Sequence, residues 1–174
     1  MRALRLVPLA LFVALPACGQ GAGWSAVRGQ IARQFPGVRQ LPPDTLAAWQ
    51  RAGRSVVLVD VREAAEVAVS RLPGARRIAP GADAAALADV PKSATVVAYC
   101  SVGWRSSAFA ERLRQAGFAD VANLDGAIFR WANEGRSLVD AAGQSVRLVH
   151  PYNRLWGRLL RPHLRAPLRA VLSP

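Results

Sequence analysis

Two uninterrupted hydrophobic runs rich in β-branched residues stand out in the middle of the chain. They cover residues 55–61 (SVVLVDV) and 94–99 (ATVVAY), and such runs are typical of strands that are buried on both faces of a sheet. Residues 77–79 and 120–124 (DVANL) form shorter hydrophobic segments. We therefore predict a strand in each of these four segments.

Hydrophobic residues recur at helical spacing between these segments. Asp44 is placed to cap one predicted helix, which ends at Gly53. Because predicted strands alternate with predicted helices, we expect an α/β fold with a mainly parallel sheet that helices cover on both faces. Trp49 and Trp131 are assigned to its core. The predicted helices cover residues 24–31, 44–52, 63–69, 81–90, 106–116 and 126–134.

Length and composition fit one domain with short additions at its ends. The 174 residues are 52% hydrophobic, which is enough for one core but short for two domains of ordinary size. The 23 basic and 11 acidic side chains give a net charge of +12. This charge favours an anionic partner, but charge alone does not choose between a substrate, a lipid and a nucleic acid.

The first residues have the layout of a secretory signal. Arg2 and Arg5 precede a hydrophobic run at 6–15 that is short for a membrane-spanning helix. LPAC at 15–18 resembles the lipobox of bacterial lipoproteins, in which Cys18 becomes the lipidated first residue. We expect an extracytoplasmic lipoprotein, on the periplasmic face or the outer membrane if the cell is Gram-negative. An ordinary secretory signal is the alternative, and nucleic acid is not an expected partner in either case.

Cys100 is the cysteine with a candidate chemical role. If Cys18 is lipidated, Cys100 has no partner for an intramolecular disulfide. A buried, unreactive side chain is one interpretation. However, Cys100 follows the predicted strand 94–99 and precedes the predicted helix 106–116. Ligands of parallel sheets bind at this carboxyl edge of the strands, so a reactive thiol is the other interpretation.

The loop after Cys100 has residues that suit an anion site. Residues 101–105 can curl so that successive backbone N–H groups point at the sulfur, beside a helix N-terminus. Such donors stabilise a thiolate, so no general base is needed. Gly103 suits a tight turn, and Arg105 supplies a positive charge for an anionic substrate. His150 and His163 lie outside the predicted domain.

Four motifs occur in an order and spacing that resemble a single-domain rhodanese-like sulfurtransferase. They are VDVRE at 59–63, LPGA at 72–75, YCSVGWRSS at 99–107 and NLDGAIFRW at 123–131. The resemblance implies a five-stranded sheet and a persulfide on Cys100, taken from a thiosulfate-like donor and passed to cyanide, a thiol or a protein acceptor. It implies no metal or other cofactor. The substrate-binding residues that we expect are Ser101, Val102, Gly103, Trp104, Arg105 and Arg62.

Two other functions are compatible with these motifs. Related phosphatases have a wider C-x5-R loop, whereas four residues separate Cys100 from Arg105. The smaller ring favours a sulfur atom over a phosphate group. The second alternative is a rhodanese module without catalytic activity that binds a partner or senses oxidants through Cys100.

Several charged residues near the motifs have a structural interpretation as well. Asp60 and Arg62 are expected to form an ion pair at the end of a strand, with direct substrate contact of Arg62 as the alternative. Glu63 and Glu66 are expected on a solvated helix face. Trp104 either shapes the entry for substrate or is simply exposed.

The chain is thus divided into a signal peptide (1–17), a tether with a short helix (18–40), a rhodanese-like domain (41–140) and a basic amphipathic tail (141–174). Arginines alternate with leucines in the tail, which suits a helix on an anionic membrane. Pro162 and Pro167 break that helix into short pieces. Packing of Trp156 and Leu159 against the domain is the alternative.

Overall fold

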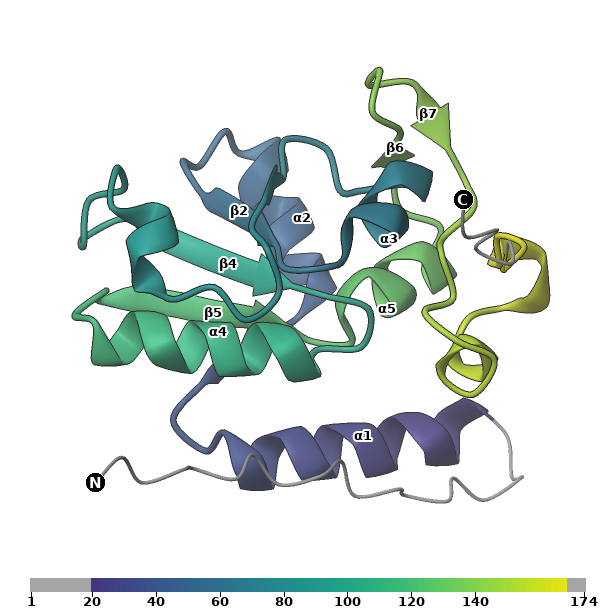
Figure 1. The fold of residues 1–174 in the computed structure, drawn as a ribbon, viewed down its shortest axis with the longest axis horizontal. Coiled ribbons are helices and arrows are strands. Elements are labelled where there is room, and N and C mark those ends of the chain that lie inside the picture. The colour runs from purple at the N-terminus through teal and green to yellow at the C-terminus, as the bar shows by residue number, and fades with distance from the viewer. Residues whose placement is uncertain (1–19, 169–174) are drawn as a thin grey trace, which may run out of the picture.

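Five parallel strands form the centre of the molecule (Figure 1). The computed structural model describes residues 20–168, and the predicted signal segment and Cys18 lie outside this range. The strands lie in the order β1-β5-β4-β2-β3, so the predicted α/β fold with a parallel sheet is confirmed. They are β1 (Arg39–Leu41), β2 (Val57–Asp60), β3 (Arg76–Arg77), β4 (Thr95–Tyr99) and β5 (Asp120–Leu124).

The two long hydrophobic runs form adjacent central strands. In their register Val57 lies beside Val96, and Val59 lies beside Ala98. The predicted segment 120–124 is β5 on the other side of β4. The fifth strand, β1, was not predicted from the residue pattern, because its three residues are too few to show a period. It lies partly in the predicted tether.

The helices cover both faces of the sheet. The chain crosses from β1 to β2 in one direction along the sheet and from β4 to β5 in the other. Because parallel crossovers are right-handed, the connecting helices α2 (Pro43–Arg51) and α4 (Trp104–Gln115) lie on opposite faces. Helix α5 (Ala127–Asn133) packs with α2, and a short 3-10 helix, η1 (Ala84–Leu87), packs with α4. Helix α3 (Ala64–Val69) follows β2.

The predicted cap of α2 is wrong. Pro42 occupies the N-cap position, and Asp44 lies inside the first turn of the helix. The Asp44 carboxylate instead accepts a hydrogen bond from Arg136 at 2.5 Å. Pro42 precedes the helix and Pro43 is its first residue. These prolines set the required backbone angles without a side-chain cap.

The segments at both ends pack on the domain. Helix α1 (Gln20–Gln34) is longer than predicted and buries Val27 and Ile31; it runs beneath α4 in Figure 1. The segment after α5 forms a two-stranded antiparallel ribbon of β6 (Leu138–Val139) and β7 (Ser145–Val146). Two 3-10 helices follow, η2 (Trp156–Leu159) and η3 (Pro162–Leu164).

The hydrophobic side chains of the tail belong to the core of the protein. Leu159, Leu160 and Leu164 are buried there, and Trp156 packs against them at the edge. Of the two interpretations of the tail, packing against the domain is therefore the one that the structure has. Between residues 20 and 168, no helix is long and apolar enough to cross a membrane.

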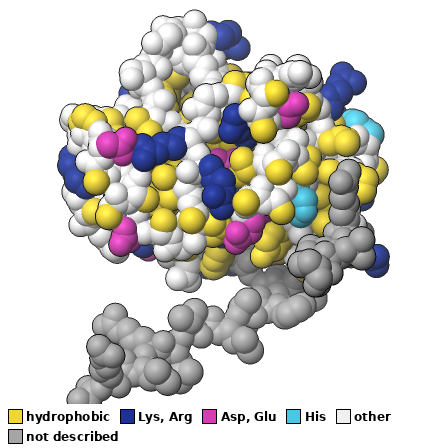
Figure 2. Space-filling view, turned by 45° about the horizontal axis from the view of Figure 1, so that its top comes forward, with side chains coloured by type: hydrophobic (Ala, Val, Ile, Leu, Met, Phe, Trp, Pro, Cys, Tyr) yellow, Lys and Arg dark blue, Asp and Glu magenta, His cyan; other side chains and the backbone are white. Residues whose placement is uncertain are grey.

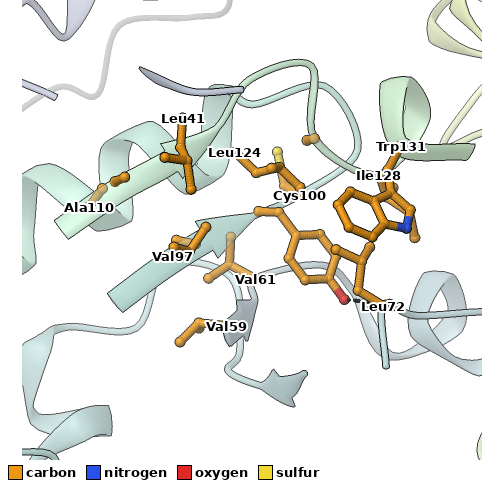
Figure 3. Close-up of a cluster of buried hydrophobic side chains, with 14 of the residues drawn as sticks. Leu41, Val59, Val61, Leu72, Val97, Cys100, Ala110, Leu124, Ile128 and Trp131 are labelled. Carbon is orange, nitrogen blue, oxygen red and sulfur yellow. Dashed lines mark hydrogen bonds between the residues drawn. The ribbon is translucent and has the colours of Figure 1, made fainter. Parts of the chain in front are cut away.

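On one face of the molecule, basic side chains are scattered rather than gathered in one area (Figure 2). On the face in Figure 2 they lie among hydrophobic side chains and a few acidic ones. Figure 3 shows part of the core, to which Val59, Val97, Leu124 and Ile128 contribute side chains. Trp131 is buried as predicted. Trp49 is half-buried, and the guanidinium of Arg54 lies over its ring, 4.0 Å from the ring centroid.

A buried ion pair fixes the end of β2. Both nitrogens Nε and Nη2 of Arg62 donate to the Asp60 carboxylate, at 3.0 and 2.8 Å. Nη2 also donates to the carbonyl oxygen of Ser70 at 2.6 Å. The predicted structural pair is therefore confirmed, and it ties β2 to the C-terminal end of α3.

Asp60→Asn is expected to destabilise the fold. It leaves the Arg62 guanidinium buried without a compensating charge, which costs about 3 kcal/mol or more. Urea unfolding followed by circular dichroism measures the change. Asp89→Asn, which breaks the exposed pair with Arg76, is the matched control and should have a much smaller effect. Equal losses in the two variants would contradict the role given to the buried pair.

Candidate active site

Cys100 lies directly after β4, at the carboxyl edge of the sheet. Its side chain points between Leu124 and Ile128 (Figure 3), and the residue is only 1% exposed. The backbone N–H of Gly103 donates to its Sγ atom at 3.2 Å. Several loop amides were expected to reach the sulfur; within residues 20–168, a backbone hydrogen bond to Sγ is found for Gly103. This donor directs the positive end of a peptide dipole at the sulfur.

Only glycine fits at position 103. Its φ angle of 110° lies in the left-handed region. A Cβ atom there would lie 3.0 Å from Nδ2 of Asn123 and 3.2 Å from Cδ1 of Ile31. The close approach of α1 and β5 to this turn therefore depends on the missing side chain. Helix α4 begins directly afterwards, so Trp104 and Arg105 lie in its first turn rather than in a loop, two residues before the predicted start.

Helix α5 holds the loop from the opposite side. The N–H of Ile128 donates to the carbonyl oxygen of Cys100 at 3.2 Å, and that of Phe129 donates to Ser101 at 3.1 Å. These amides belong to the first turn of α5 and have no partner inside their own helix. The carbonyl groups of Cys100 and Ser101 are thereby held by α5, while the amide of Gly103 faces the sulfur.

Glu66 is a central residue of the site that the sequence analysis missed. It was expected on a solvated face of its helix, and this is wrong: Glu66 is 2% exposed. Its Oε1 and Oε2 atoms accept hydrogen bonds from Arg105 at 2.9 and 2.8 Å, and Oε1 also accepts from the Ser101 hydroxyl at 2.5 Å. Glu63 is exposed as predicted.

The ionised form of Glu66 is the stable one despite its burial. Burial alone raises the pKa of this carboxyl, but the hydrogen bonds from Arg105 and Ser101 outweigh it, so the pKa is lowered. Burial disfavours the charged form of Arg105 and so lowers the pKa of its guanidinium. Glu66 and the nearby Cys100 raise this pKa by more, so that the net effect is a rise. Carboxylate and guanidinium therefore remain a charged pair.

Arg105 is oriented by the protein on two sides. Its two terminal nitrogens are directed at Glu66, and Nη2 also donates to the Ser101 hydroxyl at 3.0 Å. The ring of Tyr152, from the tail, lies against the guanidinium with its centroid 4.9 Å from Cζ. The Arg105 guanidinium was expected to pair with an anionic substrate. In the structure it binds Glu66 and Ser101 and so stabilises the loop beside Cys100.

The structure brings together six of the seven predicted site residues. Cys100, Ser101, Val102, Gly103, Trp104 and Arg105 form one loop and helix start, in which Trp104 is 43% exposed. Arg62 does not reach the surface: it is fully buried. Its guanidinium is engaged by Asp60 and by the backbone of α3, which favours the structural interpretation of Arg62 over direct contact with substrate.

A buried polar network under the loop was also missed. The Ser106 hydroxyl donates to Oδ1 of Asn123 at 2.5 Å, and Nδ2 of Asn123 donates to Oε1 of Gln40 at 2.6 Å. It links α4, β5 and β1 below the turn at Gly103. An asparagine inside an otherwise hydrophobic strand segment was the available sequence signal. Within residues 20–168, no three His, Cys, Asp or Glu side chains gather to hold a metal ion.

Comparisons with known proteins agree with this geometry. The rhodanese-like domain family matches residues 42–134. A sulfurtransferase of Allochromatium vinosum is 32% identical over 106 residues, which are 61% of this chain and 99% of that protein. The probable adenylyltransferase/sulfurtransferase MoeZ of Mycobacterium tuberculosis is 33% identical over 96 residues, 54% of this chain. The chain spans only 24% of MoeZ.

A solved structure shows the same fold. The crystal structure of a rhodanese-like domain protein from Staphylococcus aureus superposes with a TM-score of 0.53 at 27% identity, over 59% of this chain and 98% of that one. The chain therefore belongs to the rhodanese-like domain family. Together with its relatives that are named sulfurtransferases, this membership supports a role in sulfur transfer.

Glu66→Gln should reduce stability in a pH-dependent way. The lowered pKa of Glu66 means that its carboxylate stabilises the fold above the ordinary value of 4.5 and loses this contribution as the pH falls through the lowered pKa. At about pH 7 the variant should be less stable by about 2 kcal/mol, and the difference should shrink towards about pH 3. Urea unfolding at both pH values measures it.

The control for this variant is Glu111→Gln, which removes a carboxylate from a partly exposed position on α4. It should change the free energy of unfolding little at either pH. A pH-independent loss in Glu66→Gln would show that shape rather than charge matters at this position.

Proposed function

We propose that the protein is a rhodanese-type sulfurtransferase that carries a persulfide on Cys100. The observation that supports it is the hydrogen bond from the Gly103 amide to Sγ of Cys100 at 3.2 Å. It supplies a fixed donor for a thiolate or a persulfide, in a loop that Glu66, Arg105 and α5 hold in place. Because this donor is already in position before the reaction begins, the protein does not have to reorganise during the reaction.

The proposed reaction has two steps. The Cys100 thiolate attacks the outer sulfur of a thiosulfate-like donor, a sulfur–sulfur bond forms, and sulfite leaves with the electron pair of the bond that breaks. An acceptor such as cyanide, a thiol or a protein thiolate then attacks the outer sulfur of the persulfide. Cys100 leaves as a thiolate, so the enzyme is restored and no oxidant is consumed.

Features of Arg105 favour sulfur over phosphate as the group that is carried. A phosphatase loop would need the guanidinium free to bind two phosphate oxygens. Here Nη1 and Nη2 of Arg105 are both engaged by Glu66, and only four residues separate Arg105 from Cys100. The loop from Cys100 to Arg105 is therefore small, and both terminal nitrogens of Arg105 are already bound to Glu66.

One observation favours a second function, a rhodanese module without catalytic activity that binds a partner or senses oxidants. Cys100 is only 1% exposed, and a buried thiol can be unreactive. The two proposals differ in whether thiosulfate places sulfur on Cys100.

Cys100→Ser is expected to abolish thiosulfate:cyanide sulfur transfer, with a loss of at least about a thousandfold, because the nucleophile is removed. Thiocyanate formation measures the rate. After incubation with thiosulfate, the intact mass of the natural protein should rise by one sulfur atom, and that of the variant should not change. Hydrolysis of an aryl phosphate in the same assay would point to the phosphatase. Absence of both activities and of the added mass would leave the non-catalytic module.

We also propose an extracytoplasmic location with a lipid anchor on Cys18. The support is the sequence of residues 1–18, with its basic start, hydrophobic run and LPAC motif. A tail helix on the membrane is not needed for this proposal, since the leucines of η2 and η3 are buried.

Cys18→Ala should move the protein from the membrane fraction to the soluble fraction of cells, because the residue that would carry the lipid is gone. Immunoblotting of the two fractions measures the partition. The control is Cys100→Ser, which should stay with the membranes. If Cys18→Ala partitions like the natural protein, the proposed anchor is wrong.

A further inference from the structure

Two exposed aromatic side chains flank the loop of Cys100. Trp104 is 43% exposed and Tyr152 is 44% exposed. Trp104 meets Phe35, just after α1, edge to face with ring centroids 5.4 Å apart. Tyr152 comes from the tail and lies over Arg105. Both Phe35 and Tyr152 lie outside residues 42–134, the part that matches the family.

The position of Tyr152 is fixed by the tail. The N–H of Val149 donates to the carbonyl oxygen of Leu164 at 2.8 Å, and the N–H of Ala166 donates to that of Val149 at 2.9 Å. Pro151 is buried against Gly157, where a Cβ atom would lie 2.8 Å from Cβ of Pro151. The segment that carries Tyr152 is therefore anchored on both sides.

The backbone of Tyr152 is held in an unfavourable conformation. Its φ angle is 63°, which a tyrosine rarely adopts. The Tyr152 N–H donates to Nδ1 of His150 at 3.1 Å, which stabilises this turn. Such a conformation persists only where the surrounding contacts enforce it. It directs the ring at Arg105 rather than along the tail.

Arg105 connects the ring to the sulfur site. The ring lies over its guanidinium, and this guanidinium interacts with Cys100 and shares the Ser101 hydroxyl with Glu66. Cys100 itself is almost inaccessible, so a reagent must approach its sulfur past the side chains around the loop.

We propose that Tyr152 is a specificity-determining residue: its ring over Arg105 hinders the approach of bulky thiols to Cys100 and leaves small acceptors unhindered. This role rests on the proposed sulfur transfer, and it ranks the acceptors named there by size. The tail then forms part of the active site, although it lies outside the family's domain. Side chains held in fixed positions beside a reactive atom discriminate between reagents by size through steric exclusion.

Removal of the ring should change the selectivity between acceptors. In Tyr152→Ala, the ratio of kcat/KM for glutathione to that for cyanide should rise by about tenfold, because only the bulky acceptor is hindered in the natural protein. Tyr152→Phe retains the ring and should keep the original ratio. Leu148→Ala, at a 41% exposed position in the same segment, is the control and should also keep it. Rates that fall equally for both acceptors in Tyr152→Ala would overturn the proposal.

A second measurement does not depend on sulfur transfer. Alkylation of Cys100 by iodoacetamide and by a bulky fluorescein maleimide is followed by peptide mass, which separates Cys100 from Cys18. Tyr152→Ala should accelerate the maleimide reaction relative to that of iodoacetamide, and Tyr152→Phe should not. If both reagents accelerate equally, or neither does, the access role is wrong. If the labelling ratio changes but the natural protein transfers no sulfur, the access role stands and the proposed function fails.

Discussion

The site is organised around one buried carboxylate. Glu66, on the six-residue helix α3, accepts hydrogen bonds from Ser101 in the loop and from Arg105 in the first turn of α4. Without this negative charge, Arg105 would be a partly buried cation with no opposite charge beside it, and the loop would lose two of its fixed points. The carboxylate keeps its charge because the donors outweigh the cost of burial. The orientation of the Gly103 amide towards Cys100 thus depends on a residue that does not touch the sulfur.

The segments at the ends of the chain extend the domain around the same loop. Ile31 of α1 lies next to Gly103, 3.2 Å from where a Cβ atom at that position would be. The ring of Phe35 packs edge to face against that of Trp104. On the other side, the tail places Tyr152 over Arg105. Helix α1 and η2 also contact each other. The loop of Cys100 is therefore flanked by parts of the chain that neither the sheet nor its crossover helices provide.

The sheet and the position of Cys100 at its carboxyl edge could be predicted, because both depend on local pattern. Continuous β-branched runs gave β2 and β4, and Cys100 follows from its place after such a run. Glu66 could not be found in this way: in a short helix the spacing of an acidic residue does not reveal which side faces the loop, and its partners lie 35 to 39 positions away. The role of Tyr152 depends on how the tail folds back, which hydrophobic leucines alone do not determine. Long-range contacts of single polar residues thus account for the features of the site that the sequence analysis missed.

We propose that this loop holds a sulfur anion on Cys100 through the amide of Gly103, and a crystal structure of the protein after treatment with thiosulfate would show whether it does. We expect additional density for one sulfur atom bonded to Sγ, with the Gly103 amide still directed at the sulfur atoms and Glu66 still paired with Arg105. An unmodified Sγ, with the amide of Gly103 turned away from it, would show that the loop does not hold a sulfur anion.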